Sequence, residues 1–522
     1  MGSIKPPSPF VSNSIQIPTF LETFTFMDKP PAPFSIPRIQ TGTREIDALL
    51  NLIITSTMDA LTEYKKTGAG IPTPYATEAH PLDNVPDALD LKRAIRTLEG
   101  ACEALCTTLA QPMHTIINRS MPFEAQCMRL VIGNHIADIL EQFPSGLHVA
   151  EIASKTKNRM NPRKLGQVMG LLAARGCFRE GDIRELVRQQ SSLLVLRSTD
   201  PVSAYAHLST YESGKAITIF PETMAIPEYV DSETTDKCAF TYAVQDEEVT
   251  GFYEWFRKHP DLGVASAFQR QIRGLFTEPS MQMFDQSMIG ITRVEGSLSI
   301  VNNYPWSELA QGTTFCDVGS GFGTIPLALV KAHPHLKIIL QDLPNSLEQA
   351  KKMWNSEYPQ AIQSGVVRFE PLDFIAEAPV KDQDIYYMKH IVHNYPDARA
   401  IKILKNVAAA MKPSSVLFIH EYVMASQDAH ENPLAAKAPE PLLSNYGSGN
   451  LRKYNQDLHM LILFNARQRT YEQFRGLGES AGLELIELVD LVEMLVLKFR
   501  KMQDAKADFS DGLGMIPALR AS

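Results

Sequence analysis

A glycine-rich loop is the part of this 522-residue chain whose residue types and spacing point most directly to chemistry. Residues 315–323 read Phe-Cys-Asp-Val-Gly-Ser-Gly-Phe-Gly, which predicts a strand that turns into a helix over 325–332. Glycines let the backbone turn tightly and approach a ligand closely, while the first amides of the helix face that ligand. A Gly-x-Gly-x-Gly loop alone is weak evidence for a nucleotide site, so the residues that follow it decide its interpretation.

A carboxylate ends the next predicted strand, in Leu340-Gln341-Asp342. An acid about 20 residues beyond such a loop is well placed to bind both hydroxyls of a ribose. The glycine spacing differs from the Gly-x-Gly-x-x-Gly of dinucleotide sites, and Asp317 stands two residues ahead of the first glycine. This combination favours S-adenosylmethionine, a nucleoside cofactor that has no pyrophosphate.

The elements that must position these residues alternate between strands and helices from about residue 301 onward. Such alternation is typical of a parallel α/β sheet, and the short gap before the last strand predicts an antiparallel hairpin at the end of the sheet. We therefore expect a doubly wound sheet, with strands over 314–318, 337–341, 366–369, 385–388, 416–420, 483–490 and 493–499.

The residues before the sheet are predicted to be mainly helical, starting near Thr41. Three short helices and the start of a hairpin between residues 121 and 180 form a winged-helix pattern, with the helices over 128–140, 150–155 and 161–176. The third helix carries few basic residues, which favours a protein-interaction role over DNA binding. Residues 205–300 read as helical, and the aromatic stretch 252–256 suits either a pocket wall or a core.

Composition excludes several classes of protein. The chain has 50 basic and 59 acidic residues, a formal net charge of −9, so nucleic acid is not an expected partner. No apolar run approaches the roughly 20 residues that span a bilayer, and the amino terminus has no apolar signal core. The six cysteines are dispersed, which indicates free thiols in a reducing compartment. We expect a cytoplasmic protein without a membrane partner.

Four motifs together resemble the class I S-adenosylmethionine-dependent methyltransferases: Asp317–Gly323, Gln341–Pro344, Pro371–Phe374 and Tyr387–Tyr395. Within that class, the chain resembles the fungal small-molecule O-methyltransferases of the caffeate and sterigmatocystin types, over roughly residues 85–500. The resemblance implies a Rossmann-like catalytic sheet preceded by a mainly helical, winged-helix dimerisation domain. We expect a Pro-rich arm over 1–40, the dimerisation domain over 41–205, a helical connector lining the substrate pocket over 206–300, the catalytic domain over 301–503 and a flexible tail over 504–522.

The resemblance also assigns roles to individual residues. His393 falls where the family has its general base, and Glu421 matches the carboxylate that orients it. A base with a pKa near 6.5 suits removal of a proton from a phenol, whose pKa is about 10. This chemistry needs no metal, and its cofactor product is S-adenosylhomocysteine. The cofactor-binding residues implied by the match are Gly319, Asp342, Leu343, Asp373, Phe374 and Lys389.

Three positions depart from the family pattern. Asn394 and Tyr395 stand where the family has Asp and Trp, and Gln468 stands where a second glutamate usually flanks the histidine. Gln468 can still hydrogen-bond at the catalytic site, but an amide cannot offset the charge of an imidazolium. Some relatives with this fold bind S-adenosylmethionine yet catalyse dehydrations or pericyclic reactions without methyl transfer, so that activity stays as an alternative.

The resemblance implies a homodimer that methylates a hydroxyl group of an aromatic or polyketide-like secondary metabolite. A non-catalytic dimeric adaptor is a third possibility. An intact glycine loop followed by Asp342 is more than an adaptor needs.

Overall fold

The computed structural model describes residues 40–502, except 74–75, 77, 86, 157–158, 181–185, 189–193, 247, 259–279 and 426–437. The arm expected over 1–40 (Gln40 apart) and the tail expected over 504–522 lie outside the described residues. Residues from Thr41 onward form one compact unit, so the domain boundaries expected near residues 205 and 300 stay predictions.

A seven-stranded sheet forms the C-terminal half, in the order β11-β12-β8-β7-β4-β5-β6. The five strands from β8 to β6 are parallel, and β12 runs antiparallel to both β8 and β11. The doubly wound sheet with a terminal hairpin is therefore confirmed, and the strand ends differ from the predicted ones by a few residues at most. The strands are β4 (Thr314–Val318), β5 (Lys337–Asp342), β6 (Val367–Pro371), β7 (Ile385–Lys389), β8 (Val416–Glu421), β11 (Leu483–Asp490) and β12 (Leu495–Lys501).

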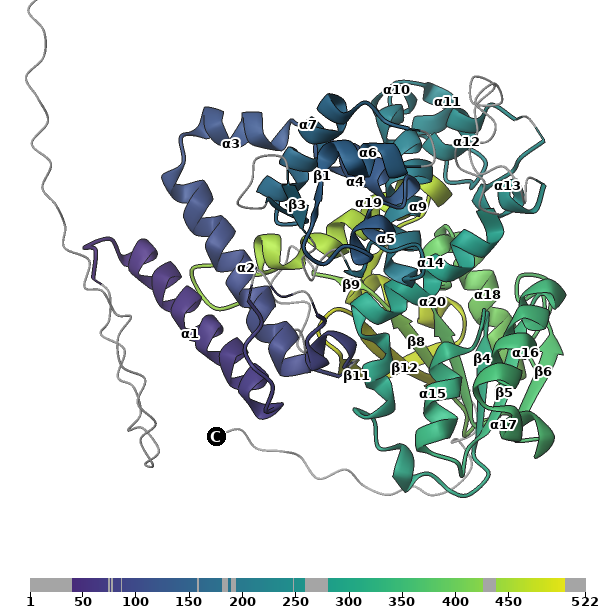
Figure 1. Ribbon diagram of the computed structural model, residues 1–522. Coiled ribbons are helices and arrows are strands. Elements are labelled where there is room, and N and C mark those ends of the chain that lie inside the picture. The colour runs from purple at the N-terminus through teal and green to yellow at the C-terminus, as the bar shows by residue number, and fades with distance from the viewer. Residues whose placement is uncertain are drawn as a thin grey trace, which may run out of the picture. The chain divides into compact units, whose positions relative to one another are not determined.

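Helices cover both faces of this sheet (Figure 1). Alternate residues of β7 point to opposite faces: Tyr386 and Met388 pack with α18 and α20, whereas Ile385 and Tyr387 pack with α15 and α16. Burial on both faces explains why the central strands read as nearly continuous apolar runs. These helices are α15 (Thr324–Ala332), α16 (Pro344–Glu357), α17 (Pro359–Gln363), α18 (Asp397–Ala410) and α20 (Tyr471–Ser480).

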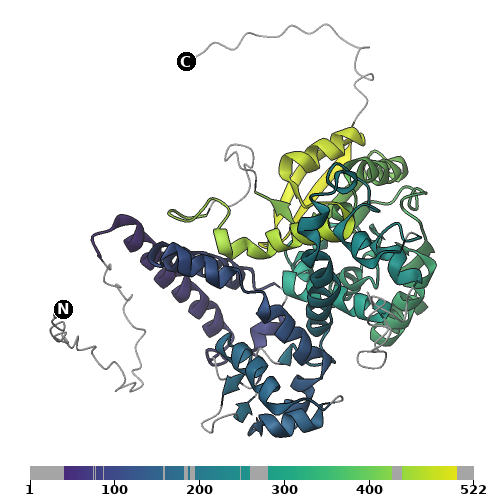
Figure 2. The same ribbon diagram turned by 90° about the horizontal axis from the view of Figure 1, so that it is seen from above.

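Two long helices, α1 (Arg44–Lys66) and α2 (Leu89–Leu109), lie side by side at the start of the described chain (Figures 1 and 2). The short η1 (Pro81–Asn84) lies between them in sequence. Leu49 of α1 and Ala101 of α2 share a small apolar cluster with Leu442 and Tyr446, from the segment before α19. The first helices are thereby attached to the catalytic half of the chain.

The described part of the region predicted as a winged helix contains four short helices, and the strands β2 and β3 follow the last of them, as expected for a hairpin; the strand β1, which precedes α6, was not predicted. One difference is that the helix expected over 128–140 is broken, because His135 adopts a left-handed conformation with φ of 53°. The three short strands form one antiparallel sheet in the order β1-β3-β2. The elements are α4 (Phe123–Gly133), α5 (Ile136–Glu141), β1 (Leu147–His148), α6 (Val149–Lys155), α7 (Pro162–Ala174), β2 (Arg179–Glu180) and β3 (Leu186–Arg188).

The described residues between this region and the sheet are mainly helical, as expected. Residues of α9, α12 and α13 share an apolar core with α19 (Leu451–Phe464), which comes from the catalytic half. No helix in the described part of the chain is long and apolar enough to cross a membrane. These helices are α9 (Pro201–Thr218), α10 (Phe220–Thr223), α11 (Pro227–Val230), α12 (Ala239–Val244), α13 (Phe252–Lys258), α14 (Ser280–Glu295), η3 (Ser297–Val301) and η4 (Trp306–Glu308).

Candidate active site

His393 lies in the short helix η5 (Val392–Asn394), directly after β7, and is buried. Its Nδ1 atom lies 3.0 Å from Oε2 of Glu421, the last residue of β8, and 2.8 Å from the side-chain amide of Gln468. The carboxyl ends of neighbouring parallel strands meet at one edge of a sheet, which is why β7 and β8 deliver these two side chains together. The three residues expected to act on the substrate hydroxyl thus form one cluster.

Glu421 also shapes the backbone that carries the histidine. Its Oε1 accepts hydrogen bonds from the N–H groups of Ile391, Val392 and His393, at 3.1, 2.9 and 3.3 Å. From the other side, the buried Arg469 donates to the carbonyl of Val392 at 2.9 Å. The imidazole therefore sits on a segment that is held by a carboxylate and a guanidinium, so little reorganisation is needed to use it.

Burial dominates the electrostatics of this cluster. It holds the pKa of His393 well below its usual value, and the neighbouring His390 acts in the same direction. Burial also raises the pKa of Glu421, whereas its three backbone hydrogen bonds and the nearby Arg469 favour its charged form. His393 is consequently a neutral imidazole at physiological pH, which is the form that can accept a proton.

A second histidine–carboxylate pair adjoins the first, and the sequence analysis did not identify it. His390 Nε2 lies 2.7 Å from Oε2 of Glu295, a buried residue at the end of α14. The His390 ring stacks on that of His393, with centroids 4.9 Å apart and 27° between the planes. His390 has a φ of 55°, a backbone conformation that non-glycine residues seldom adopt and that often marks functional segments. No local pattern could have indicated Glu295, because it precedes His390 by 95 residues.

His390, His393 and Glu421 also place ligand atoms within 4.8 Å of one another, which makes them a possible metal-binding group among the described residues. One oxygen of Glu421 accepts hydrogen bonds from three amides, and the other lies 3.0 Å from Nδ1 of His393. The arrangement fits a pair of oriented imidazoles better than a metal centre.

The glycine loop approaches this cluster closely. Gly319 has a φ of 77°, and a Cβ there would lie 2.5 Å from Ile391 Cδ1 and 3.2 Å from the ring of Phe374. Asp342 accepts hydrogen bonds from the N–H of Gly321 at 2.8 Å and from that of Leu343 at 2.7 Å. The loop, the acid and the aromatic ring expected at the cofactor thus share one edge of the sheet.

Buried acids next to the loop suit a ligand with a positive charge. Burial, together with the charge of nearby Asp342, raises the pKa of Asp317 to about 8. A cation bound beside Asp317 would favour its ionised form. The sulfonium of S-adenosylmethionine carries that charge, so the residues present fit this cofactor.

The remaining residues expected at the cofactor are more dispersed. Lys389, at the end of β7, donates to Thr292 Oγ1 at 3.0 Å, and burial lowers the pKa of its amine. Asp373 accepts a hydrogen bond from the N–H of Ile375 at 3.0 Å and so caps the turn after β6. Leu343 is exposed at the start of α16. Lys389 thus lies toward α14, on the side of the two histidines.

A cavity of about 50 Å³ opens beside the two imidazoles. The wall of this cavity is largely apolar and aromatic. The aromatic stretch 252–256, predicted to be either a pocket wall or part of a core, contributes to both, because Phe252 lines the cavity and also packs in the core with α9 and α19. Asn394, one of the residues that differ from the family pattern, donates a hydrogen bond to the hydroxyl of Tyr253 in that wall at 3.1 Å. The lining includes Tyr253, Phe284, Met288, His459, Met460 and Phe464.

Comparisons with known proteins show the family of this chain. Residues 276–484 match the model of the O-methyltransferase domain family. A relative from Phanerochaete chrysosporium described as 3-O-methyltransferase 2 is 34% identical over 460 residues, which cover 87% of this chain and 97% of that protein.

Solved structures share the fold at low sequence identity. The mitomycin 7-O-methyltransferase MmcR superposes with a TM-score of 0.56 at 18% identity, covering 77% of this chain and 99% of its own. A structure described as a pericyclic reaction enzyme reaches 0.59 at 16% identity, covering 87% and 100%. The similarity to the Phanerochaete protein extends over nearly its whole length, and the chain therefore belongs to the fungal S-adenosylmethionine-dependent O-methyltransferases.

Proposed function

We propose that His393 is the general base of a reaction that methylates the hydroxyl group of an aromatic small molecule, with Glu421 as its orienting carboxylate. The observation that carries this proposal is the asymmetric environment of the imidazole. Nδ1 is held between Glu421 and Gln468, whereas Nε2 has no hydrogen-bond partner among the described residues and the ring lines the cavity. The Glu421 carboxylate favours a proton on Nδ1, provided that the Gln468 amide turns its unpaired oxygen, rather than its NH2 group, toward that atom. The Nε2 lone pair is then free to accept the proton of the substrate.

S-adenosylmethionine, when bound, supplies an activated methyl group on its sulfonium. The residues of this chain then have two tasks, which are to hold the hydroxyl oxygen in line with that methyl group and to remove one proton. His393 takes the proton at Nε2, and the imidazolium that forms is stabilised by the Glu421 carboxylate at 3.0 Å. The glycine loop, Asp342 and Phe374 would hold the nucleoside, while Leu343, Asp373 and Lys389 complete the proposed cofactor site.

The cavity supports an aromatic or polyketide-like acceptor. Tyr253 and Phe464 lie with ring centroids 5.2 Å apart, and Phe284 packs against Tyr253 at 5.8 Å. Rings arranged in this way accept a flat apolar molecule, and the two histidines supply the few polar groups that orient it. One fold relative, NcsB1, was solved with 2-hydroxy-5-methyl naphthoic acid, a ligand of the same chemical class.

The test is methyl transfer from labelled S-adenosylmethionine to a panel of phenols, catechols and hydroxyquinones. We expect labelled product with the native protein, and none with His393→Ala, although that variant still binds S-adenosylhomocysteine. Cofactor binding without transfer to any acceptor would instead favour a dehydration or pericyclic reaction. Two observations support that alternative: the chain shares its fold with a structure described as a pericyclic reaction enzyme, and Asn394 and Gln468 depart from the family pattern.

We also propose that the chain forms a homodimer through α3 and its neighbours. The helix α3 (Pro112–Arg119) has no buried residue, although it is rich in apolar side chains. An apolar patch of this kind on a protein surface usually marks an interface. The apolar side chains exposed along this stretch are Leu109, Met113, Ile116, Ile117, Met121 and Phe123.

Sedimentation measurements test the dimer. Ile116→Glu should yield monomers, whereas Met224→Glu, at an exposed apolar residue outside this stretch, should sediment like the native protein. Monomeric native protein would exclude the proposal.

A cytoplasmic location is supported by the six cysteines, all of which are free thiols.

A further inference from the structure

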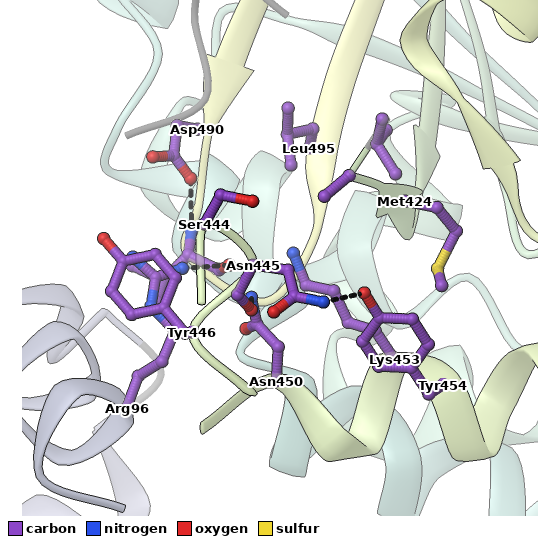
Figure 3. Close-up of a pocket in the computed structure, with 13 residues that line it drawn as sticks. Arg96, Met424, Ser444, Asn445, Tyr446, Asn450, Lys453, Tyr454, Asp490 and Leu495 are labelled. Carbon is purple, nitrogen blue, oxygen red and sulfur yellow. Dashed lines mark hydrogen bonds between the residues drawn. The ribbon is translucent and has the colours of Figure 1, made fainter. Parts of the chain in front are cut away.

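A cavity of about 60 Å³, with both polar and apolar walls, lies between α2, the segment that contains η6 (Gly447–Asn450), the start of α19 and the tip of the β11–β12 hairpin. Figure 3 shows Arg96 and Tyr446 on one side of it and Lys453 and Tyr454 on the other. It shares no lining residue with the cavity beside His393. The proposed catalytic mechanism does not use any of its side chains.

The guanidinium of Arg96 lines this cavity and has too few hydrogen-bond acceptors around it. The residue is only 8% exposed, and a guanidinium has five N–H groups to satisfy. Its Nη1 donates to the carbonyl of Val492 at 3.2 Å, while its Nε is buried with no hydrogen-bond partner among the described residues. The guanidinium lies over the ring of Tyr446, 4.0 Å from the centroid, which fixes its position without satisfying its donors.

Lys453 brings a second desolvated cation from the first turn of α19. It is 7% exposed and has no hydrogen bond or ion pair with any residue that the structure describes. Burial lowers the pKa of its amine to about 8. At neutral pH both side chains are cationic, and no carboxylate of the described residues forms an ion pair with either of them.

The rest of the lining does not neutralise these charges. Asp490 is the acidic side chain of the wall, and its Oδ1 accepts the N–H of Val492 at 2.8 Å. Glu493 lies nearby, but it is paired with Arg452 at 2.6 Å. Among the described residues that line it, the cavity therefore carries two positive charges against one negative charge. Its other polar groups belong to Ser444, Asn445, Asn450 and Tyr454.

We propose that this cavity binds a compact oxyanion, such as a phosphate, a sulfate or a carboxylate group. Buried cations without a partner are costly, and an anion that accepts from both Arg96 and Lys453 would remove that cost. Guanidinium and ammonium groups are the side chains that bind such anions most strongly. The positive end of the α19 dipole adds to the attraction. This proposal goes beyond the methyl transfer reaction and does not depend on it.

The binding experiment uses the full-length protein saturated with S-adenosylhomocysteine, so that the cofactor site is filled. Sodium phosphate, sulfate and acetate are titrated at constant ionic strength and followed by calorimetry. The thermal unfolding midpoint is measured in parallel. We expect saturable binding of at least one of these anions, and the comparison among the three tells a tetrahedral anion from a carboxylate. Lys453→Gln should weaken that binding at least ten-fold.

Matched variants separate this site from general salt effects, because phosphate and sulfate stabilise most proteins by exclusion from the surface. Lys352→Gln, on the exposed surface of α16, should bind the anion as the native protein does. Lys453→Arg keeps the charge and should retain binding, which guards against a variant that merely folds poorly.

Three results would overturn the proposal. One is the absence of saturable binding, and another is equal binding by the native protein and Lys453→Gln; either means that the cavity holds water only. The third is a pair of findings: the native protein binds no anion, and Lys453→Gln no longer forms the dimer. That result would mean that the two cations pair with a carboxylate of a second copy of the chain.

Discussion

Replacing Glu421 by Gln tests how the imidazole of His393 is oriented. An amide at position 421 can still accept the backbone hydrogen bonds now made by Oε1 of Glu421, at 2.9–3.3 Å, so the segment 391–393 should keep its conformation. The amide nitrogen would then replace Oε2, which lies 3.0 Å from Nδ1 of His393. Since the side-chain amide of Gln468 lies 2.8 Å from the same atom, both neighbours of Nδ1 would be amides.

Two amide neighbours favour the tautomer whose Nδ1 accepts a hydrogen bond and whose Nε2 carries the proton. That tautomer cannot remove a proton from the substrate, and the imidazolium would also lose its carboxylate partner. General-base catalysis typically contributes about 10²–10⁴-fold, so we expect kcat to fall by that factor. The fall equals about 3–5 kcal/mol in the activation free energy, since each factor of ten is about 1.4 kcal/mol.

The assay is kcat for methyl transfer from labelled S-adenosylmethionine at saturating acceptor, with the Kd for S-adenosylhomocysteine measured in parallel. The Kd should not change. Glu295→Gln is the matched control, because it makes the same substitution at the carboxylate of the neighbouring His390 pair. A kcat for Glu421→Gln within about three-fold of the native value would refute the orienting role. A large loss in Glu295→Gln alone would assign the base to His390.

Four further predictions concern the histidine cluster and the cofactor loop beside it. The pKa of His393 lies well below its usual value, so the imidazole stays deprotonated and able to act as a base below pH 6.5. The value of kcat/KM should therefore stay constant as the pH falls through 6.5. Gln468→Glu places a carboxylate beside Nδ1 and should move the acid limb of that profile up by about 1–3 pH units; an unmoved limb would contradict the assignment. Asp342→Asn should weaken S-adenosylhomocysteine binding by about 1–3 kcal/mol in calorimetry, and unchanged affinity would exclude Asp342 from the site. Gly319 has a φ of 77°, and a Cβ at this position would lie 2.5 Å from Ile391. Gly319→Ala should therefore lower the free energy of unfolding in urea by about 1–2 kcal/mol and weaken cofactor binding. Native stability together with native cofactor affinity would contradict the close approach of the loop to Ile391.

The sequence alone predicted the sheet and the loop because both are written in local patterns. Strands that are buried on both faces appear as short apolar runs, and a tight turn before a helix requires glycines at fixed positions. The helix over 128–140 shows the limit of such patterns. Its apolar spacing continues across His135, where the backbone turns left-handed and ends α4.

The candidate active site was predicted in part. Motif resemblance named His393, Glu421 and Gln468, and these side chains do meet, because β7 and β8 end at the same edge of the sheet. The pairing of His390 with Glu295 was not foreseen, since a carboxylate at the end of α14 has no sequence signal that connects it with β7.

The sequence by itself determined the order of strands and helices, the glycine loop and the residue types available for catalysis, because each depends on neighbours a few positions away. Only the tertiary structure decided which distant groups face one another. Arg96 reaches the carbonyl of Val492, 396 residues later in the chain, and Lys453 lines the same cavity. Burial also lowered the pKa of the Lys453 amine, because the free energy of an ionised side chain depends on how much water and which partners surround it in three dimensions.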